Sequence, residues 1–402
     1  MKLLLIKIGK AWHTLRREGL FHGGKRVFVA ASALFRRVQP GDILFISGGV
    51  GDSARYRCEH VAEELSLQGY RTSVTVQDNP FLLSYTEQFS VFVFHRVLYT
   101  GQAKSLFIQL KKLQKEIIFE TDDLVYDPQY LVHMDYFQHM NTLEKKLYEH
   151  GVGGEMLADP YVQVATTTTS FLAEKLRARG KQVFVVPNKL SGEDMKKVDT
   201  TLENQSKKDT QSEKVVVSYF SGTASHNKDF ATITEPLLFI LERYPHTELA
   251  LYGPLDLDER FSLFGTRVKK LPFAGREKHF ENISQTDINV APLEIDNPFC
   301  ESKSELKFFE AGAFGVPTIA TATQTFREAI ENGVDGFVAA TPAEWKDCLE
   351  QLVKSATLRK TMGEQARKKV LSQYVTTNTK NSPYYQYLSR KIAKKEDKTF
   401  SN

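Results

Sequence analysis

The chain has 402 residues, more than one hydrophobic core usually supports, so two domains of ordinary size are expected. Hydrophobic residues make up 41% of the sequence and charged residues 25%, and no apolar run approaches the roughly 20 residues that cross a bilayer. The three cysteines are scattered and show no CxxC spacing. This pattern argues against a disulfide framework and a zinc site, and it fits a reducing cytosol.

The net charge of +4 is unevenly distributed, because residues 1–37 contain nine Lys or Arg and one acidic residue, Glu18. That segment carries +8 and the remainder −4. Apolar residues at near-helical spacing lie among these cations: Leu3, Leu4, Leu5, Ile8, Trp12 and Leu15. Residues 1–40 are therefore interpreted as a basic amphipathic segment for an anionic membrane surface, the alternatives being a solvated arm or a docking helix. Lys7 and Lys10 interrupt any signal peptide, and no nucleic-acid motif accompanies the charge.

From Gly41 onward, short β-rich runs alternate with amphipathic helical stretches, which is typical of a parallel sheet with crossover helices. The helical stretch 55–69 places Cys58, Val61 and Leu65 near one face and ends at a glycine. Residues 41–190 are predicted to form a first Rossmann-like, acceptor-binding domain. Its expected strands are 42–49, 71–77, 90–96, 116–123, 161–169 and 182–188.

Residues 191–213 contain few large apolar side chains, so they are predicted to be a polar linker or surface loop. A second Rossmann-like domain, expected to bind the donor, is predicted over residues 214–370. Residues 371–402 are predicted to be a helix and tail, frayed from Lys391. The expected strands of this domain are 214–223, 247–254, 287–293, 317–321 and 335–340. The predicted fold class is α/β, with two doubly wound domains and a ligand cleft at their strand ends.

The segment ESKSELKFFEAGAFGVPTIAT (301–321) carries a helical glutamate, Glu310, into a glycine-proline turn and a strand. It resembles glycosyltransferase family 4, the group 1 retaining enzymes of the GT-B type. The resemblance implies that Glu310 binds the donor ribose, the alternative being an exposed glutamate that balances Lys303 or Lys307. Ser302 stands where the family has a sugar-contacting glutamate, so Glu301 is the substitute catalytic candidate and Ser302 is kept as a donor-binding position.

The segment 218–230 predicts a small-residue turn that cradles a phosphate, because such a turn lets backbone N–H groups approach an anion. The resemblance assigns Lys228 to the donor diphosphate and a catalytic role. In the same comparison, Gly222 stands where the family has an arginine. Lys307 could supply the positive charge that is missing there. Thr223 and His226 complete the donor-binding candidates, and simple solvation is the alternative for the lysines.

In the first domain, the glycine-rich turn containing Gly49 and the following Arg55 and Arg57 are predicted to bind the acceptor, the alternative being solvated arginines. Asp122 and Asp123 follow a buried strand that contains Glu120, and they are predicted to orient acceptor hydroxyls rather than bind a divalent ion. His95, at a neighbouring strand end, is a catalytic candidate. A buried structural histidine is the alternative.

The resemblance implies a hexosyltransferase-like enzyme of polysaccharide or glycoconjugate synthesis. It would move a sugar from a nucleotide-diphosphate donor to a glycan, lipid-linked or protein-linked acceptor, without a metal or other cofactor. We expect it in the cytoplasm, held on the inner face of the cell membrane by its basic segment. The alternatives are a catalytically degenerate GT-B subunit that binds glycan or acts as a scaffold, and a GT-B epimerase or sugar-phosphate phosphorylase.

Overall fold

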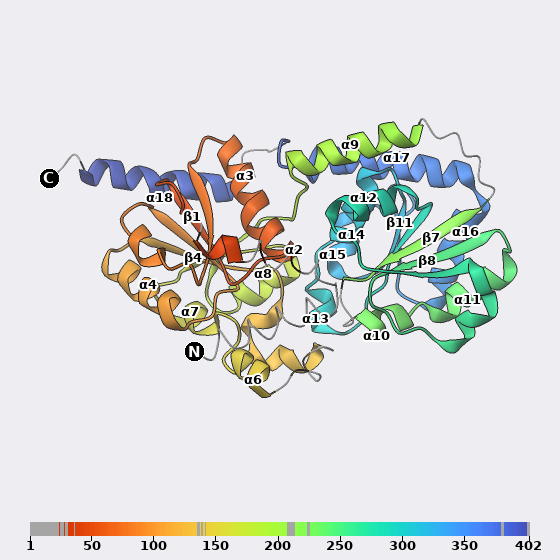
Figure 1. The fold of residues 1–402 in the computed structure, drawn as a ribbon, viewed down its shortest axis with the longest axis horizontal. Coiled ribbons are helices and arrows are strands. Elements are labelled where there is room, and N and C mark those ends of the chain that lie inside the picture. The colour runs from red at the N-terminus through yellow and green to blue at the C-terminus, as the bar shows by residue number, and fades with distance from the viewer. Residues whose placement is uncertain are drawn as a thin grey trace. The chain divides into compact units, whose positions relative to one another are not determined.

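The computed structural model describes residues 24, 28, 31–35, 37–134, 137, 140, 142–206, 214–222, 226–378 and 382–399. The chain divides into two compact units, each built on a parallel sheet with helices on both faces (Figure 1). Unit 1 comprises Met1–Val132, Phe137–Pro187 and Lys380–Asn402, and unit 2 comprises His133–Tyr136 and Asn188–Thr379.

The sheet of unit 1 has the strand order β2-β1-β3-β4-β5-β6, and every pairing is parallel. All five residues of β1 are buried, as expected for a parallel strand covered on both faces. The six predicted strands are all observed: β1 (Ile43–Ser47), β2 (Thr72–Val76), β3 (Val91–His95), β4 (Glu116–Thr121), β5 (Val164–Thr167) and β6 (Gln182–Val185).

Helical elements connect these strands. Cys58, Val61 and Leu65 are buried on one face, as their spacing predicted. The connecting elements are α2 (Asp52–Ala54), the π-helical turn η1 (Arg55–Glu59), α3 (His60–Leu67), η2 (Leu82–Tyr85), α4 (Gly101–Lys112), η3 (Leu124–Tyr126), η4 (Pro128–His133), α6 (Thr142–Lys145), η5 (Lys146–Tyr148), α7 (Gly154–Ala158) and α8 (Ser170–Arg177).

The C-terminal helix α18 (Pro383–Thr399) returns to unit 1 and completes its core. Tyr384, Tyr385 and Leu388 are buried against residues of β1, β3 and α3. Lys391 forms an ion pair with Glu116 at 2.6 Å. The prediction that the chain frays from Lys391 was wrong for the start of this segment, because that lysine lies within a helix and is paired, whereas residues 400–402 lie outside the described residues.

Unit 2 has the strand order β12-β11-β10-β7-β8-β9, again all parallel. Five strands were predicted, whereas β9 was missed because its sequence VKKL is short and half charged. The strands are β7 (Val215–Phe220), β8 (Thr247–Tyr252), β9 (Val268–Leu271), β10 (Ile288–Ala291), β11 (Thr318–Thr321) and β12 (Phe337–Ala339).

The helical elements of unit 2 enclose its core, in which Trp345 and Leu349 of α16 are buried beside the sheet. They are α9 (Gly192–Ser206), α10 (Asn227–Ala231), α11 (Thr234–Arg243), η7 (Glu259–Arg267), α12 (Arg276–Ser284), α13 (Pro298–Glu301), α14 (Leu306–Ala313), α15 (Gln324–Ala329), α16 (Pro342–Lys354) and α17 (Ala356–Gln373).

The segment predicted to be a polar linker, 191–213, instead begins with α9, whose single fully buried apolar side chain is Val198. Polar contacts hold the helix to unit 2: Asp194 pairs with Arg276 of α12 at 2.7 Å, and Asp199 pairs with Arg367 of α17 at 3.2 Å. The linker prediction was wrong for this part because it counted only apolar residues. The remainder, residues 207–213, lies outside the described residues.

Candidate functional site

In unit 1 the strand order reverses between β1 and β3, and parallel α/β sheets bind ligands beyond the carboxyl ends of strands at such a point. A pocket lies there. Gly48 permits the close approach of the two strand ends, because a Cβ on it would lie 1.9 Å from the carbonyl oxygen of Arg96. The pocket is lined by Ser47, Gly48, Gly49, Val50, Ser53, Ala54, Gln77, His95, Arg96, Leu98, Val125, Tyr148 and Val152. Two predicted residues, Gly49 and His95, are among them.

A row of polar side chains crosses the sheet beneath this pocket. The register places Ser47 beside His95, His95 beside Glu120, and Glu120 beside Thr166. Residues in register on parallel strands point to the same face. These four buried polar side chains therefore lie in a row on one face of the sheet.

Arg57 is fully buried and is neither solvated nor available to a phosphate. Its Nε and Nη2 donate to the two carboxylate oxygens of Glu120 at 2.8 and 3.1 Å, and its Nη1 donates to the carbonyl of Val186 at 2.6 Å. The acceptor-binding prediction for Arg57 is corrected, because its charge is used inside the core. Arg55 is partly exposed and pairs with Asp52 in the first turn of the same helical segment.

Asp122 and Asp123 both form ion pairs with Arg96, a residue that the sequence did not point to as part of the site. Its Nε donates to Asp122 at 2.5 Å and its Nη2 donates to Asp123. Asp123 is buried and also accepts from the backbone N–H of Val125 at 3.0 Å. This ion pairing explains why adjacent carboxylates are tolerated, and it corrects Asp123 from an acceptor-binding to a structural residue. Arg96 has a φ of 49°, a strained conformation for a non-glycine residue, of the kind found at functional sites.

Ser53 of α2 connects His95 to Asp122. Its hydroxyl lies 2.9 Å from Nε2 of His95 and donates to Oδ2 of Asp122 at 2.8 Å. Sequence reasoning missed Ser53, because a serine in a glycine-rich turn has no distinguishing pattern.

His95 is 1% exposed and lies at the floor of the pocket. Burial lowers its pKa to about 3, despite the opposing influence of the Asp122 charge. Its Nδ1 has no hydrogen-bond partner and lies 4.0 Å from Oε1 of Glu120. His95 is therefore neutral at physiological pH and does not act as a cationic acid.

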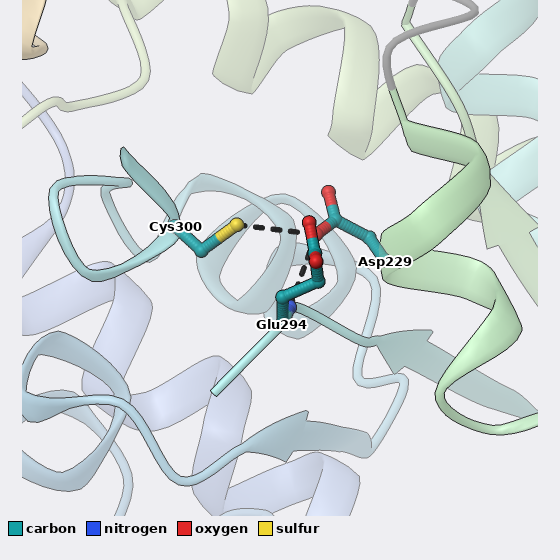
Figure 2. Close-up of side chains that lie close together, drawn as sticks. All are labelled: Asp229, Glu294 and Cys300. Carbon is teal, nitrogen blue, oxygen red and sulfur yellow. Dashed lines mark hydrogen bonds between the residues drawn. The ribbon is translucent and has the colours of Figure 1, made fainter. Parts of the chain in front are cut away.

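In unit 2 the strand order reverses between β7 and β10. The segments that follow these strands bring together Asp229, Glu294 and Cys300, whose potential metal-ligating atoms all lie within 4.8 Å of one another (Figure 2). Buried Asp229 accepts hydrogen bonds from the Glu294 backbone N–H at 3.1 Å and the Cys300 thiol at 3.2 Å. Its second oxygen lies 2.8 Å from Nδ1 of His226. Since these contacts satisfy the carboxylate, we interpret the cluster as a hydrogen-bonded anchor between segments.

His226 contacts this anchor through Asp229, and Lys303 and Lys307 lie close enough for their charges to act on His226. Burial lowers the pKa of His226, and the lysine charges lower it further against the effect of Asp229. Burial likewise lowers the pKa of Lys307, opposed by Asp229 and Glu310. Lys228 is exposed on α10, and Gly222 is exposed at the preceding turn. Thr223 lies outside the described residues.

Glu310 is buried on α14, in contrast to the exposed glutamate of the alternative interpretation. Its oxygens accept from Nη1 of Arg276 and lie 3.2 Å from Nε2 of His279. The ring of His279 packs edge-on against Phe220, which stacks on Tyr252 at 4.7 Å between ring centroids. Gly315, with a φ of 71°, allows the helix to end directly before β11. Arg276, His279 and the aromatic pair were not predicted.

The remaining two candidates lie at α13. Ser302 is fully buried, and its hydroxyl donates to the Phe299 carbonyl at 2.8 Å, so it stabilises the end of the helix and does not contact a sugar. Its donor-binding prediction is corrected for this reason. Glu301 is half-buried and accepts from the backbone N–H of Gln324 at 3.0 Å, at the start of α15.

Comparisons with known proteins identify the class to which this architecture belongs. Residues 235–379 match a family model described as glycosyl transferase-like, whereas no curated protein matches the sequence. The chain is similar to sucrose-phosphate synthase from Thermosynechococcus elongatus, at 14% identity and a TM-score of 0.55 over 90% of this chain and 100% of that one. It is also similar to HepE from Anabaena in complex with UDP, at 13% identity and a TM-score of 0.55 over 89% of this chain and 100% of that one.

A glycosyltransferase from Rickettsia africae is similar as well, at 13% identity and a TM-score of 0.55 over 89% of this chain and 97% of that one. Identities this low show the fold, which is GT-B with two Rossmann-like units, as predicted. With the family match, they confirm the expected resemblance to glycosyltransferases of this fold. Residues 235–379 of unit 2 are therefore glycosyl transferase-like.

Most of the basic segment 1–37 lies outside the described residues. Among the helices that the structure describes, none is long and apolar enough to span a membrane.

Proposed function

We propose that this protein is a retaining glycosyltransferase that moves a sugar from a nucleotide-diphosphate donor to a hydroxyl group of a glycan, lipid-linked or protein-linked acceptor. The observation that carries the proposal is the gathering of His226, Lys303 and Lys307 at the strand reversal of unit 2. Lys303 and Lys307 supply the positive charge, because the lowered pKa of His226 leaves its imidazole neutral at pH 7. Asp229, Glu294 and buried Glu310 lie in the same region and offset part of this charge. Such a site favours an anion with several oxygens, and a diphosphate satisfies it.

The nucleotide is proposed to lie along α14. Lys307 and Glu310 are three residues apart and thus one turn apart on that helix, so a diphosphate at Lys307 would bring the ribose towards Glu310. A carboxylate has about four acceptor positions, so Glu310 can accept from a ribose hydroxyl in addition to Arg276 and His279. UDP and UDP-glucose occur in the HepE structures, which supports a uridine nucleotide as the first donor to test.

The proposed chemistry is stabilisation of the departing diphosphate by cations, together with exact placement of the acceptor. Preorganised charges and orientation are the usual sources of rate in such reactions. Lys228 and Lys307 are proposed to bind the diphosphate oxygens, and the carboxylate of Glu301 is proposed to contact the transferred sugar. No metal is needed for these roles, because lysines already supply the positive charge.

On the acceptor side, the unit 1 pocket is proposed to hold the hydroxyl that receives the sugar, with Gly49 and His95 in its lining and Asp122 behind the lining residue Ser53. Arg57 and Asp123 are excluded from this role by their burial and pairing. The basic segment 1–37 is proposed to hold the enzyme on an anionic membrane surface, where a lipid-linked or polysaccharide acceptor is made.

Calorimetric titration with UDP and UDP-glucose tests donor binding. Lys307→Met should weaken UDP binding by roughly tenfold or more, because a charged hydrogen bond contributes about 1.5–3 kcal/mol. The matched control is Lys278→Met, which removes an exposed lysine paired with Glu281 and should leave affinity unchanged. Equal affinities for the two variants would refute the site.

A turnover assay on the same samples separates the alternatives. Transfer to an added acceptor supports the proposed enzyme. Binding without any turnover indicates a degenerate subunit, whereas epimerised sugar or sugar phosphate formed without an acceptor indicates the epimerase or phosphorylase.

A further inference from the structure

Ser53 occupies an unusual position, because its hydroxyl contacts two polar groups and also lines the unit 1 pocket. A serine hydroxyl has one proton to donate and two lone pairs that accept. The neighbours of Ser53 determine which group receives the proton and which groups donate to the two lone pairs.

The proton of Ser53 is committed to Asp122. That carboxylate is ionised: burial opposes the charge, but Arg96 at 2.5 Å, together with the Ser53 hydrogen bond, lowers its pKa well below the usual range. An ionised carboxylate only accepts, so the 2.8 Å contact requires Ser53 to donate.

It follows that His95 donates to Ser53. With the single hydroxyl proton directed at Asp122, the 2.9 Å contact to Nε2 is a hydrogen bond only if that nitrogen carries the hydrogen. A neutral imidazole then leaves Nδ1 bare, in agreement with its lack of a hydrogen-bond partner. The nearest Glu120 oxygen, at 4.0 Å, is too distant to accept from Nδ1, and it already accepts from Arg57.

We infer that Ser53 is a substrate-binding residue that accepts a hydrogen bond from a hydroxyl group, through the one lone pair that remains directed at the pocket. The chain of donors then runs from the ligand hydroxyl to Ser53 and on to Asp122, and a charged terminal acceptor strengthens each link. Groups that only accept, such as the oxygens of a sulfate, are disfavoured here because Ser53 has no second proton.

The charges around the pocket agree with a neutral ligand. Arg96 pairs with both Asp122 and Asp123, and Arg57 pairs with Glu120. The positive charges of these two arginines are therefore balanced by carboxylates. The inference deepens the proposed function, on which it rests for the ligand class: the unit 1 pocket takes a neutral, hydroxyl-rich sugar rather than a phosphate.

Long-range ¹H–¹⁵N NMR of protein labelled at histidine tests the hydrogen-bond assignment without requiring activity. His95→Gln identifies the His95 signals among the 10 histidines. The expected result is a neutral Nε2–H tautomer at pH 7 in the wild type and in Ser53→Thr, which keeps the hydroxyl. Ser53→Ala should give a mixture of tautomers. An Nδ1–H tautomer in the wild type, or a tautomer unchanged in Ser53→Ala, overturns the inference.

The ligand class is tested by titrating the same sample with glucose, which donates through hydroxyls, and with sodium sulfate, which cannot. Glucose should shift the His95 Nε2–H signal and sulfate should not. Ser53→Ala should weaken the glucose response about threefold to tenfold, in keeping with one neutral hydrogen bond. The exposed-site control Ser105→Ala should respond like the wild type. A response to sulfate alone, or none to glucose, overturns the ligand class, while UDP binding to unit 2 tests the proposed function separately.

Discussion

Arg57 and Glu120 form an ion pair that is enclosed by unit 1, with side-chain exposures of 0% and 3%. The two side chains come from the π-helical turn after α2 and from the centre of the sheet. Because the guanidinium also donates to the Val186 carbonyl, this one side chain joins the helical turn to β4 and to the segment after β6.

Removing one partner of this pair should destabilise unit 1 strongly. Arg57→Met leaves the Glu120 charge buried without compensation, which typically costs about 3–5 kcal/mol. The double variant Arg57→Met/Glu120→Leu should recover most of the loss, because an apolar pair avoids the buried charge. Chemical unfolding followed by fluorescence measures both effects. Arg55→Met, the control at a partly exposed ion pair, should cost at most about 1 kcal/mol. A similarly small loss for Arg57→Met would contradict the enclosed pair.

The pKa of His95 predicts a pH dependence of stability. The value in the folded protein is about 3 and the ordinary value is 6.5, so the unfolded chain binds a proton between these limits and the folded chain does not. The free energy of unfolding contributed by His95 should therefore fall as pH decreases through this window, by up to about 1.4 kcal/mol per pH unit. His95→Gln should flatten this dependence relative to the wild type. Parallel stability curves for the two proteins between pH 6.5 and 4.5 would show that His95 is not buried in neutral form.

The C-terminal helix is expected to be essential for unit 1. Removing residues 382–402 exposes the surface that Tyr384, Tyr385, Tyr387 and Leu388 cover. At about 1.5–3 kcal/mol for each large buried side chain, the loss rivals the whole stability of an ordinary domain. The truncated chain should lose cooperative unfolding of unit 1, measured by hydrogen exchange, while unit 2 keeps its protection. Removing residues 400–402 alone is the control. Full protection of unit 1 in the longer truncation would exclude this role.

The basic segment predicts association with anionic lipid. Each Lys or Arg near such a surface contributes about 1 kcal/mol, and salt screens the attraction. A variant that lacks residues 1–37 should fail to sediment with anionic vesicles while still binding UDP. Neutral vesicles should retain neither protein. Equal sedimentation of both proteins with anionic vesicles would assign the attraction to another part of the surface.

The fold followed from the sequence because strand and helix periodicity is a local property. Eleven runs such as DILFISGG and TELALYGP were long and apolar enough to be recognised as strands, whereas VKKL of β9 was not. The helix α9 was missed because its position depends on ion pairs of Asp194 and Asp199 with residues more than 80 positions away. Distant charge pairing leaves no periodic signal.

The same distinction applies to the candidate site. Glu310 and Lys307 could be named as candidates because they lie within one recognisable segment, and their roles in donor binding stay predictions. Arg57, Asp123 and Ser302 were assigned to ligands, yet each is occupied by a partner that the fold supplies. The sequence shows that a charged residue is present, but only tertiary structure shows whether that charge is already neutralised. Ser53 was overlooked for the related reason that its importance comes from His95, at the end of β3, and Asp122, directly after β4.

The return of α18 to unit 1 also constrains how the protein is made. This helix leaves the ribosome only after all of unit 2 has been synthesised. The apolar surface of unit 1 that the tyrosines of α18 cover is therefore exposed during that interval. Unit 2 is nearly contiguous in sequence and can mature without delay. A nascent chain paused within unit 2 should therefore present an apolar surface that chaperones recognise, and completion of the final helix should release them.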